Sequence, residues 1–245
     1  MSFTDDEIER YARHLVLAEI GGPGQQRLKA ARVALVGVGG VGAPAALYLA
    51  AAGVGTLRLI DDDNVALSNL QRQIAFAEGD VGRPKTAAAA AALTALNPHV
   101  AVEPRTERLS PANAPLLLDG CDLVIDGTDD FATRFAVSDA CLALGLPLVS
   151  GALGRWSGQV GVFVGRPCYR CLVPAAPPDA ETCARVGVVG ALAGVVGSLA
   201  ALETIKLVVG AGEALTGRLL IYDGLAATAR TVRIAADPAC PACGG

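Results

Sequence analysis

The chain has 245 residues, a formal net charge of −4, and a composition that is 52% hydrophobic but only 4% aromatic. High hydrophobicity with little net charge excludes an intrinsically disordered chain. The slight acidity argues against a nucleic-acid binder that depends on bulk positive charge.

Two long uncharged runs, residues 33–57 and 186–202, raise the question of a membrane span, which needs about 20 apolar residues. Glycines and Pro44 divide the first run into strand, turn and helix, and the second is short and continues into Glu203 and Lys206. The N-terminus lacks the apolar core of a signal peptide. We therefore expect a soluble, cytoplasmic protein without a membrane partner.

In chain order, a capping box at Thr4–Glu7 predicts a first helix through Leu15, and IGGPGQQ after it reads as a loop. Strands then alternate with helices, apart from the polar segment 61–82, which predicts no long element. Such alternation predicts a Rossmann-like, doubly wound, mostly parallel α/β sheet. The expected strands are 32–36, 56–60, 100–105, 122–126 and 147–151, and the expected helices 43–52, 84–96, a short one opening at Ser110-Pro111, and 131–144.

The pattern changes after Gly158, and we expect a mixed C-terminal part. Its predicted elements are a strand at 159–164, a cysteine-rich loop (PCYRCLVPAAPPDAETC), a helix at 190–209, and strands at 218–222 and 228–234.

A glycine-rich turn lies between the strand 32–36 and the following helix, and it predicts a nucleotide site. GVGGVG lets a phosphate approach backbone amides at a helix N-terminus. Asp61, 19 residues beyond the last of these glycines, is placed to bind a ribose. The alternative is a tight turn without a ligand. The four glycines are Gly37, Gly39, Gly40 and Gly42.

Three polar residues after this fingerprint, Asn69, Arg72 and Lys85, suggest a cationic cage for a reacting phosphate, because nucleotidyl transfer needs cations around its oxygens. Asp129 follows the strand 122–126 and therefore lies at the edge of the sheet where ligands bind. We expect it to hold Mg²⁺. The bland alternative is an aspartate that only caps a helix.

These motifs, in this order, resemble the ThiF/MoeB/HesA superfamily of ubiquitin-activating-like adenylyltransferases, and the resemblance extends from RYARHLVLAEI to the terminal CPACGG. It implies ATP-dependent adenylylation of the C-terminal Gly carboxylate of a small ubiquitin-like sulfur-carrier protein, with release of pyrophosphate. Asp61 then matches the ribose ligand, Asn69, Arg72 and Lys85 the phosphate-binding set, and Asp129 the magnesium ligand. The chain has Thr128-Asp129-Asp130 where the family often has TDN, which puts the local metal geometry in doubt.

The resemblance also implies a homodimer, since Arg13 matches an arginine that enters the ATP site of the other subunit. One domain is expected over residues 1–245, with an N-terminal helical arm (1–30), a nucleotide-binding part (31–155) and a carrier-binding and zinc part (156–245).

The seven cysteines include two CxxC pairs, Cys168/Cys171 and Cys240/Cys243, separated by 68 residues. Four thiolates in two such pairs suit a structural, tetrahedral zinc site. Cys121 and Cys141 read as small core residues. Cys183 lies in a polar loop, where it either forms a covalent link with the carrier, as the resemblance allows, or is an inert thiol.

Two other functions fit part of the sequence. GVGGVG with Asp61 fits an NAD-dependent oxidoreductase, which leaves Lys85 and the CxxC pairs unexplained. A non-catalytic binder of a ubiquitin-like protein leaves the intact Arg72, Lys85 and Asp129 unexplained.

Overall fold

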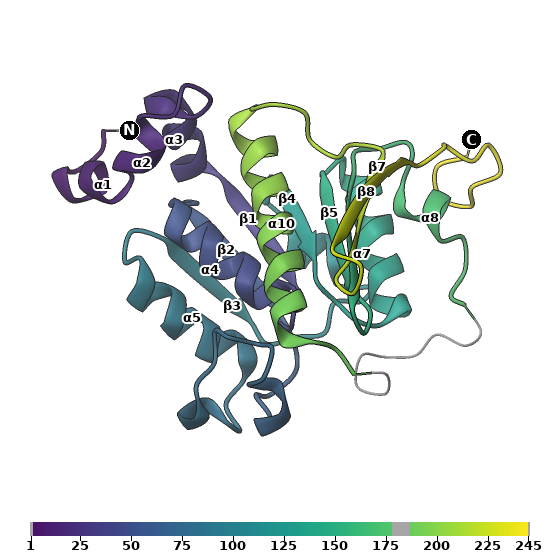
Figure 1. Cartoon of the computed structure of the whole chain (residues 1–245), viewed down its shortest axis with the longest axis horizontal. Helices are drawn as coiled ribbons and strands as arrows, with labels where there is room; N and C mark the ends of the chain where they lie inside the picture. The colour runs from purple at the N-terminus through teal and green to yellow at the C-terminus, as the bar shows by residue number, and fades with distance from the viewer. Residues whose placement is uncertain (1, 178–186, 245) are drawn as a thin grey trace.

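The structure is a computed structural model that describes residues 2–177 and 187–244. At its centre lies an eight-stranded sheet in the order β3-β2-β1-β4-β5-β6-β7-β8 (Figure 1). The first five strands in that order are parallel, and β6, β7 and β8 continue the sheet in antiparallel fashion. This confirms the predicted parallel sheet with a mixed C-terminal part. The strands are β1 (Arg32–Val36), β2 (Thr56–Ile60), β3 (Ala101–Arg105), β4 (Leu123–Asp126), β5 (Leu148–Leu153), β6 (Ser157–Phe163), β7 (Arg218–Asp223) and β8 (Thr228–Arg233).

Helices cover both faces of the sheet, because side chains along each central strand alternate between two apolar clusters. Val33 and Leu35 of β1 pack with α3, α4, α5 and α10, whereas Ala34 and Val36 pack with α6, α7 and α8. The fold is therefore doubly wound. The helices are α1 (Asp5–Arg10), α2 (Ala12–Leu15), α3 (Gly21–Ala30), α4 (Gly42–Ala52), α5 (Lys85–Leu96), α6 (Ala114–Leu118), α7 (Phe131–Leu144), α8 (Tyr169–Leu172) and α10 (Gly190–Val209).

Three local predictions are wrong. The expected loop IGGPGQQ opens α3, because Pro23 fits a first turn and the buried Gln25 amide donates to the Ala52 carbonyl at 2.8 Å. The helix expected from Ser110 begins at Ala114, since Asn113 Oδ1 accepts from the Ser110 amide and closes a turn ahead of it. The cysteine-rich loop contains the one-turn helix α8.

The glycine-rich turn follows β1, which lies beside β4 in the sheet. At this point the connections that follow the two strands go to opposite faces of the sheet. Gly37 has φ +83°, and a Cβ there would lie 3.0 Å from backbone atoms of Gly127 and Thr128. A Cβ on Gly42 would lie 1.9 Å from the Gly37 carbonyl oxygen. Glycine is therefore required for the turns after β1 and β4 to touch, and they meet at the switch point where α/β sheets bind ligands.

Helix α10 has the length and hydropathy of a membrane span, yet half of its most apolar window is buried. It packs on α3, α4, β5 and β6, and glycines allow the close approach: a Cβ on Gly197 would lie 2.4 Å from the Pro44 ring. This is the packing of a core helix in a soluble protein.

A buried ion pair joins β4 to α7. Asp126 is 1% exposed and Arg134 is 7% exposed, and the Arg134 Nη1 atom lies 3.5 Å from Asp126 Oδ2. The Arg134 guanidinium also donates to the Gly151 carbonyl at 2.8 Å, to the Thr128 carbonyl and to the Ser150 hydroxyl. Although burial disfavours the charged guanidinium, the Asp126 side chain raises the pKa of Arg134, so the guanidinium remains charged.

We predict that Asp126→Ala lowers the free energy of unfolding by about 3–5 kcal/mol, because it leaves the Arg134 charge buried and uncompensated. Glu213→Ala is the control: it breaks the ion pair with Arg218 in which Glu213 is 89% exposed, and it should cost about 1 kcal/mol or less. Urea denaturation of both variants at one protein concentration measures the difference. Equal losses would contradict a central role for the buried pair.

Candidate active site

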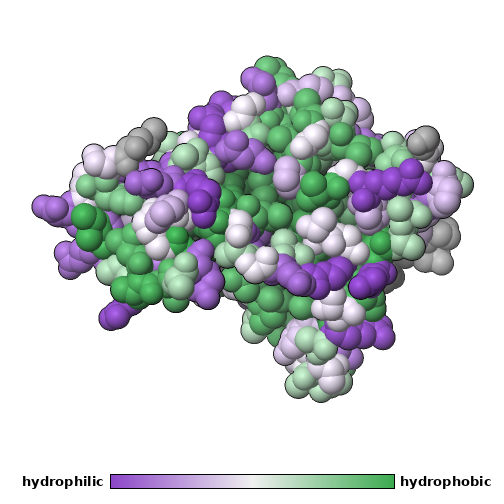
Figure 2. Space-filling view, turned by 90° about the horizontal axis from the view of Figure 1, so that it is seen from above, coloured by the Kyte–Doolittle hydropathy of each residue, from purple (hydrophilic) through white to green (hydrophobic). Residues whose placement is uncertain are grey.

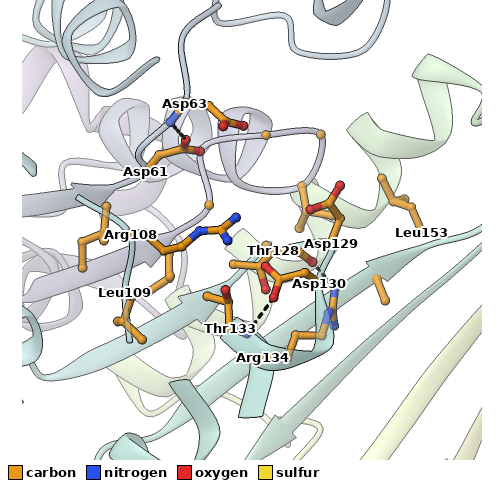
Figure 3. A pocket seen from close by; sticks show the side chains of 18 of the residues that line it. Asp61, Asp63, Arg108, Leu109, Thr128, Asp129, Asp130, Thr133, Arg134 and Leu153 are labelled. Atoms are coloured by element: carbon orange, nitrogen blue, oxygen red, sulfur yellow. Dashed lines mark hydrogen bonds between the residues drawn. The ribbon is translucent and has the colours of Figure 1, made fainter. Parts of the chain in front are cut away.

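A cavity of about 450 Å³ opens at the carboxyl edge of the parallel strands, over the β1–β4 switch point. Its wall is formed mainly by the glycine-rich turn, by the segments that follow β2, β3 and β4, and by the end of β5. In Figure 3, Asp61 and Asp63 lie on one side of the cavity, and Asp129 and Asp130 lie on the other. The structure thus brings together, in one hollow, residues that the sequence places far apart.

Asp61 follows β2 and fixes the glycine-rich turn. Its Oδ2 accepts from the Val38 amide at 2.7 Å and its Oδ1 accepts from the Asp63 amide at 2.9 Å. Burial raises the pKa of this carboxyl, and the nearby Lys85 ammonium opposes that shift. The remaining lone pairs of both oxygens can still accept from hydroxyl groups of a ligand, which fits a ribose.

Lys85 opens α5, and its side chain is only 8% exposed. Its ammonium lies 2.7 Å from Asp63 Oδ2, a carboxylate that is 63% exposed. An ammonium held on the cavity wall by one exposed partner can exchange that partner for the phosphate oxygens of a ligand at little cost.

Asn69 and Arg72 reach the same cavity from the segment after β2. The Asn69 Oδ1 atom accepts from the Ala66 amide, which orders a short 3₁₀ turn at Leu67–Asn69. The Arg72 guanidinium donates to the Ser68 carbonyl at 3.0 Å, and its Cδ would lie 3.8 Å from a Cβ on Gly40. Arg72 therefore borders the glycine-rich turn, as a phosphate-binding cation should.

Asp129 and Asp130 follow β4 and have different roles. Asp130 caps α7, since its Oδ1 accepts from the Thr133 amide at 2.8 Å. Asp130 therefore has the helix-cap role that was the alternative for this motif. It stands where the family often has the Asn of TDN, and it still supplies an oxygen that accepts the capping hydrogen bond. Asp129 is left facing the cavity (Figure 3), where its carboxylate oxygen is the type of ligand that Mg²⁺ prefers.

Several further residues line the cavity without having been predicted from the sequence, among them Gln73, Arg108, Arg134 and Tyr169. Arg108 follows β3 and its guanidinium extends into the hollow (Figure 3). Because Arg108 follows a parallel strand, the sequence could have identified it as a candidate site residue. Gln73 is 3% exposed, and its Oε1 atom has no partner within the described residues. A buried, unsatisfied acceptor on a cavity wall indicates a ligand that donates there.

Arg13 is not in this cavity. It lies on α2, and the preceding Tyr11 packs over Gly53 at the far end of α4. Helix α4 runs for 11 residues from the cavity to Gly53, a length of about 16 Å, so the segment that carries Arg13 meets α4 at the end remote from the cavity. Cys183 lies outside the described residues.

The two CxxC pairs converge at the C-terminal end of the chain. Cys168 Sγ lies 3.6 Å from Cys240 Sγ, Cys171 Sγ lies 3.4 Å from Cys243 Sγ, and all four sulfurs lie within 4.8 Å of one another. Zn–S bonds of about 2.3 Å in a tetrahedron place sulfurs about 3.8 Å apart, so the cluster fits zinc. Burial raises the pKa of the Cys168 thiol, whereas backbone amides of Ala242 and Cys243 outweigh burial and lower that of Cys240 to about 7.

Cys121 and Cys141 are core residues, as predicted, and His14 also has a structural role. Cys121 and Cys141 are buried in the cluster between α6 and α7, and burial raises the pKa of both thiols. The His14 ring is hydrogen-bonded to Gln25 Oε1 at 2.9 Å.

Comparisons with known proteins show the family of the chain. The sequence model of the ThiF family matches residues 11–242. The chain is 47% identical over 247 residues to a "SAMP-activating enzyme E1" of Haloferax volcanii, covering 100% of this chain and 92% of the relative. It is 43% identical over 244 residues to the "Molybdopterin-synthase adenylyltransferase" of Escherichia coli K12, covering 98% of each.

A "Sulfur carrier protein adenylyltransferase" of Thermus thermophilus is 46% identical over 254 residues, covering 100% of this chain and 93% of the relative. Among solved structures, "Crystal structure of E. coli MccB + MccA-N7isoASN" has a TM-score of 0.86 at 22% identity, and the match covers 100% of this chain and 76% of that one. This likeness shows the fold. With the family match over almost the whole sequence, it follows that the chain belongs to the ThiF family.

Proposed function

We propose that this protein is an adenylyltransferase that uses ATP to activate the C-terminal Gly carboxylate of a small ubiquitin-like sulfur-carrier protein. The observation that carries the proposal is the cavity over the switch point, whose wall contains Lys85, Arg72, the glycine-rich turn and Asp129. The names of the family relatives support the reaction class and the kind of substrate.

The reaction balances without an added base. An oxygen of the already ionised carrier carboxylate attacks the α-phosphorus of ATP, and a new P–O bond forms. The bond from the α-phosphorus to the bridging oxygen breaks, and pyrophosphate leaves with the electron pair. The product is a mixed anhydride, in which AMP is a good leaving group for later attack by sulfur.

The main physical obstacle is that two anions must meet, and the chain's own residues offset their repulsion. Arg72 and Lys85 supply positive charge to the phosphate oxygens, the N-terminus of α4 adds free amides, and Asp61 orients the ribose. Asp129 would hold Mg²⁺, which supplies further charge neutralisation at the phosphates when bound.

The alternative functions account for less. A nicotinamide-dependent oxidoreductase explains the glycine-rich turn and Asp61, but it gives no reason for Lys85 or for the cysteine cluster. A non-catalytic binder gives no reason for a cavity that brings Arg72, Lys85 and Arg108 together with the Asp129 carboxylate.

We predict that Lys85→Ala and Arg72→Ala each lower carrier-dependent ATP–pyrophosphate exchange by at least about 100-fold, because each removes charge from the site of the leaving phosphates. The fold should remain, since Lys85 pairs only with an exposed aspartate. Arg83→Ala is the matched control: Arg83 lies two residues from Lys85, is 49% exposed and pairs with Asp80 outside the cavity. Wild-type exchange rates in the Lys85 or Arg72 variant would refute the assignment.

We further propose that the cysteine cluster holds one structural zinc ion per chain. Four protein ligands leave no open position for water, so the ion would tie the C-terminal tail to the segment after β6.

Metal analysis of the purified wild type should find about one zinc per chain. Cys240→Ser should lose the metal and lower the melting temperature, because binding free energy contributes to folding. Cys121→Ser, which changes a core cysteine outside the cluster, should keep the zinc. Equal zinc contents in the wild type and the Cys240 variant would contradict this proposal.

A homodimer would explain Arg13. This exposed arginine is remote from its own cavity, so it can act on ATP only in a second copy. The N-terminal arm, at the left of Figures 1 and 2, also exposes apolar side chains such as Val16, at 78%, and Leu17, at 45%. Such side chains are suited to contact with another subunit.

We predict that Arg13→Ala and Lys85→Ala are each inactive, and that co-expressing the two restores about one quarter of the wild-type exchange rate. Random pairing puts both lesions in one site of each mixed dimer and leaves the other site intact. No recovery, with mixed dimers present, would show that Arg13 does not act across an interface.

We also propose that residues 31–155 bind the nucleotide and that residues 156–245 bind the carrier and zinc. Cys183 is a candidate for a covalent link with the carrier. The protein is proposed to work in the cytoplasm.

A further inference from the structure

The cysteine cluster and the nucleotide cavity share a wall. Tyr169 lies between Cys168 and Cys171 in the sequence, is 3% exposed and lines the cavity. Its ring packs edge-on against Phe163, with 5.6 Å between centroids, and its hydroxyl interacts with the Arg134 guanidinium. A residue of the cysteine knuckle therefore contacts the same arginine that anchors the turn after β4.

The next residue fastens the knuckle to α7. Arg170 makes a two-pronged pair with Asp139, with Nε and Nη2 each 2.8 Å from a carboxylate oxygen. Its guanidinium also lies 4.2 Å from the Phe135 ring centroid. Both contacts lie on the helix that carries Arg134, so the knuckle and α7 are held in one relative position.

Arg134 also holds the turn after β4, which carries Asp129 at the cavity. It donates to the Thr128 and Gly151 carbonyls, and the Thr128 amide and hydroxyl both donate to Asp126 Oδ1. The Thr128 peptide is thus held from two directions, and the next residue is Asp129. A small displacement of Arg134 would move the carboxylate that faces the nucleotide.

We propose that Arg134 and Tyr169 are positioning residues of the nucleotide site, and that pairing of the two cysteine knuckles keeps Tyr169 in place against Arg134. Closing the cluster then preorganises the Thr128–Asp129 turn as well as fastening the tail. The inference rests on the proposed function only in taking ATP as the ligand of the cavity.

The test is a calorimetric ATP titration of the zinc-containing full chain. Tyr169→Phe removes only the hydroxyl beside Arg134 and should raise the Kd for ATP about tenfold, and Tyr169→Leu, which also removes the ring, should raise it further. Tyr48→Phe is the matched control: Tyr48 is 58% exposed on α4, and ATP binding should not change. Wild-type affinity in both Tyr169 variants, with their zinc retained, overturns the proposal.

Two further measurements separate positioning from general stability. Arg170→Gln breaks the pair with Asp139 without touching a cysteine; it should retain zinc and still weaken ATP binding. Chelation of zinc should weaken ATP binding by the wild type severalfold. It should weaken ATP binding by the Tyr169→Phe variant little further, because that variant already lacks the contact between the Tyr169 hydroxyl and Arg134. Equal effects of chelation on the two proteins, or an Arg170 variant with wild-type ATP affinity, would count against the proposal.

Failure of the proposed function gives a different result. A wild type that binds ATP, with affinity dependent on Tyr169, but catalyses no carrier-dependent pyrophosphate exchange, contradicts adenylylation and supports the positioning role. A wild type that does not bind ATP overturns both.

Discussion

A buried charge must find its partner inside the protein, and the Asp126–Arg134 pair meets this requirement at the point where the ligand site is built. Arg134 has acceptors on the turn after β4 and near the end of β5, and Asp126 holds the Thr128 amide. The hydrogen bonds donated by the Arg134 guanidinium therefore fix two segments of the cavity wall relative to α7. Glycine at position 37 then lets the nucleotide-binding turn close against this fixed edge.

The carboxyl edge of the sheet collects charges of both signs. Each parallel strand ends there, so Asp61, Lys85, Arg108 and Asp129 meet although separate loops carry them. A net charge of −4 describes the whole chain and does not describe this local set. Before a ligand arrives, cations such as Lys85 are paired with exposed carboxylates, which keeps them in place without neutralising them permanently. In the proposed reaction, the phosphates of ATP would take the place of those partners.

The scarcity of aromatic residues follows from close backbone packing. Gly42, Gly127, Gly158 and Gly197 lie where a Cβ would meet another atom at less than 3 Å, so α4, α10 and the sheet approach one another closely. Four of the ten aromatic residues are grouped in one place: Phe131, Phe135, Phe163 and Tyr169 form a connected set between α7, β6 and the cysteine knuckle. This group joins the cysteine knuckle that contains Tyr169 to α7 and β6.

The sequence by itself determined the order of strands and helices and the nucleotide-binding turn, because hydrophobic periodicity and glycine spacing are local signals. It did not predict α3, since Gln25 and Pro23 read as loop residues until the contact with Ala52 is known. It assigned Asp61, Arg72, Lys85 and Asp129 through their motifs. Arg134 and Tyr169 were missed because an arginine in a helix and a tyrosine in a CxxC pair gain meaning only from neighbours distant in the chain. Tertiary structure decided that these two residues link the cysteine cluster to the cavity, and that Arg13 lies outside its own site.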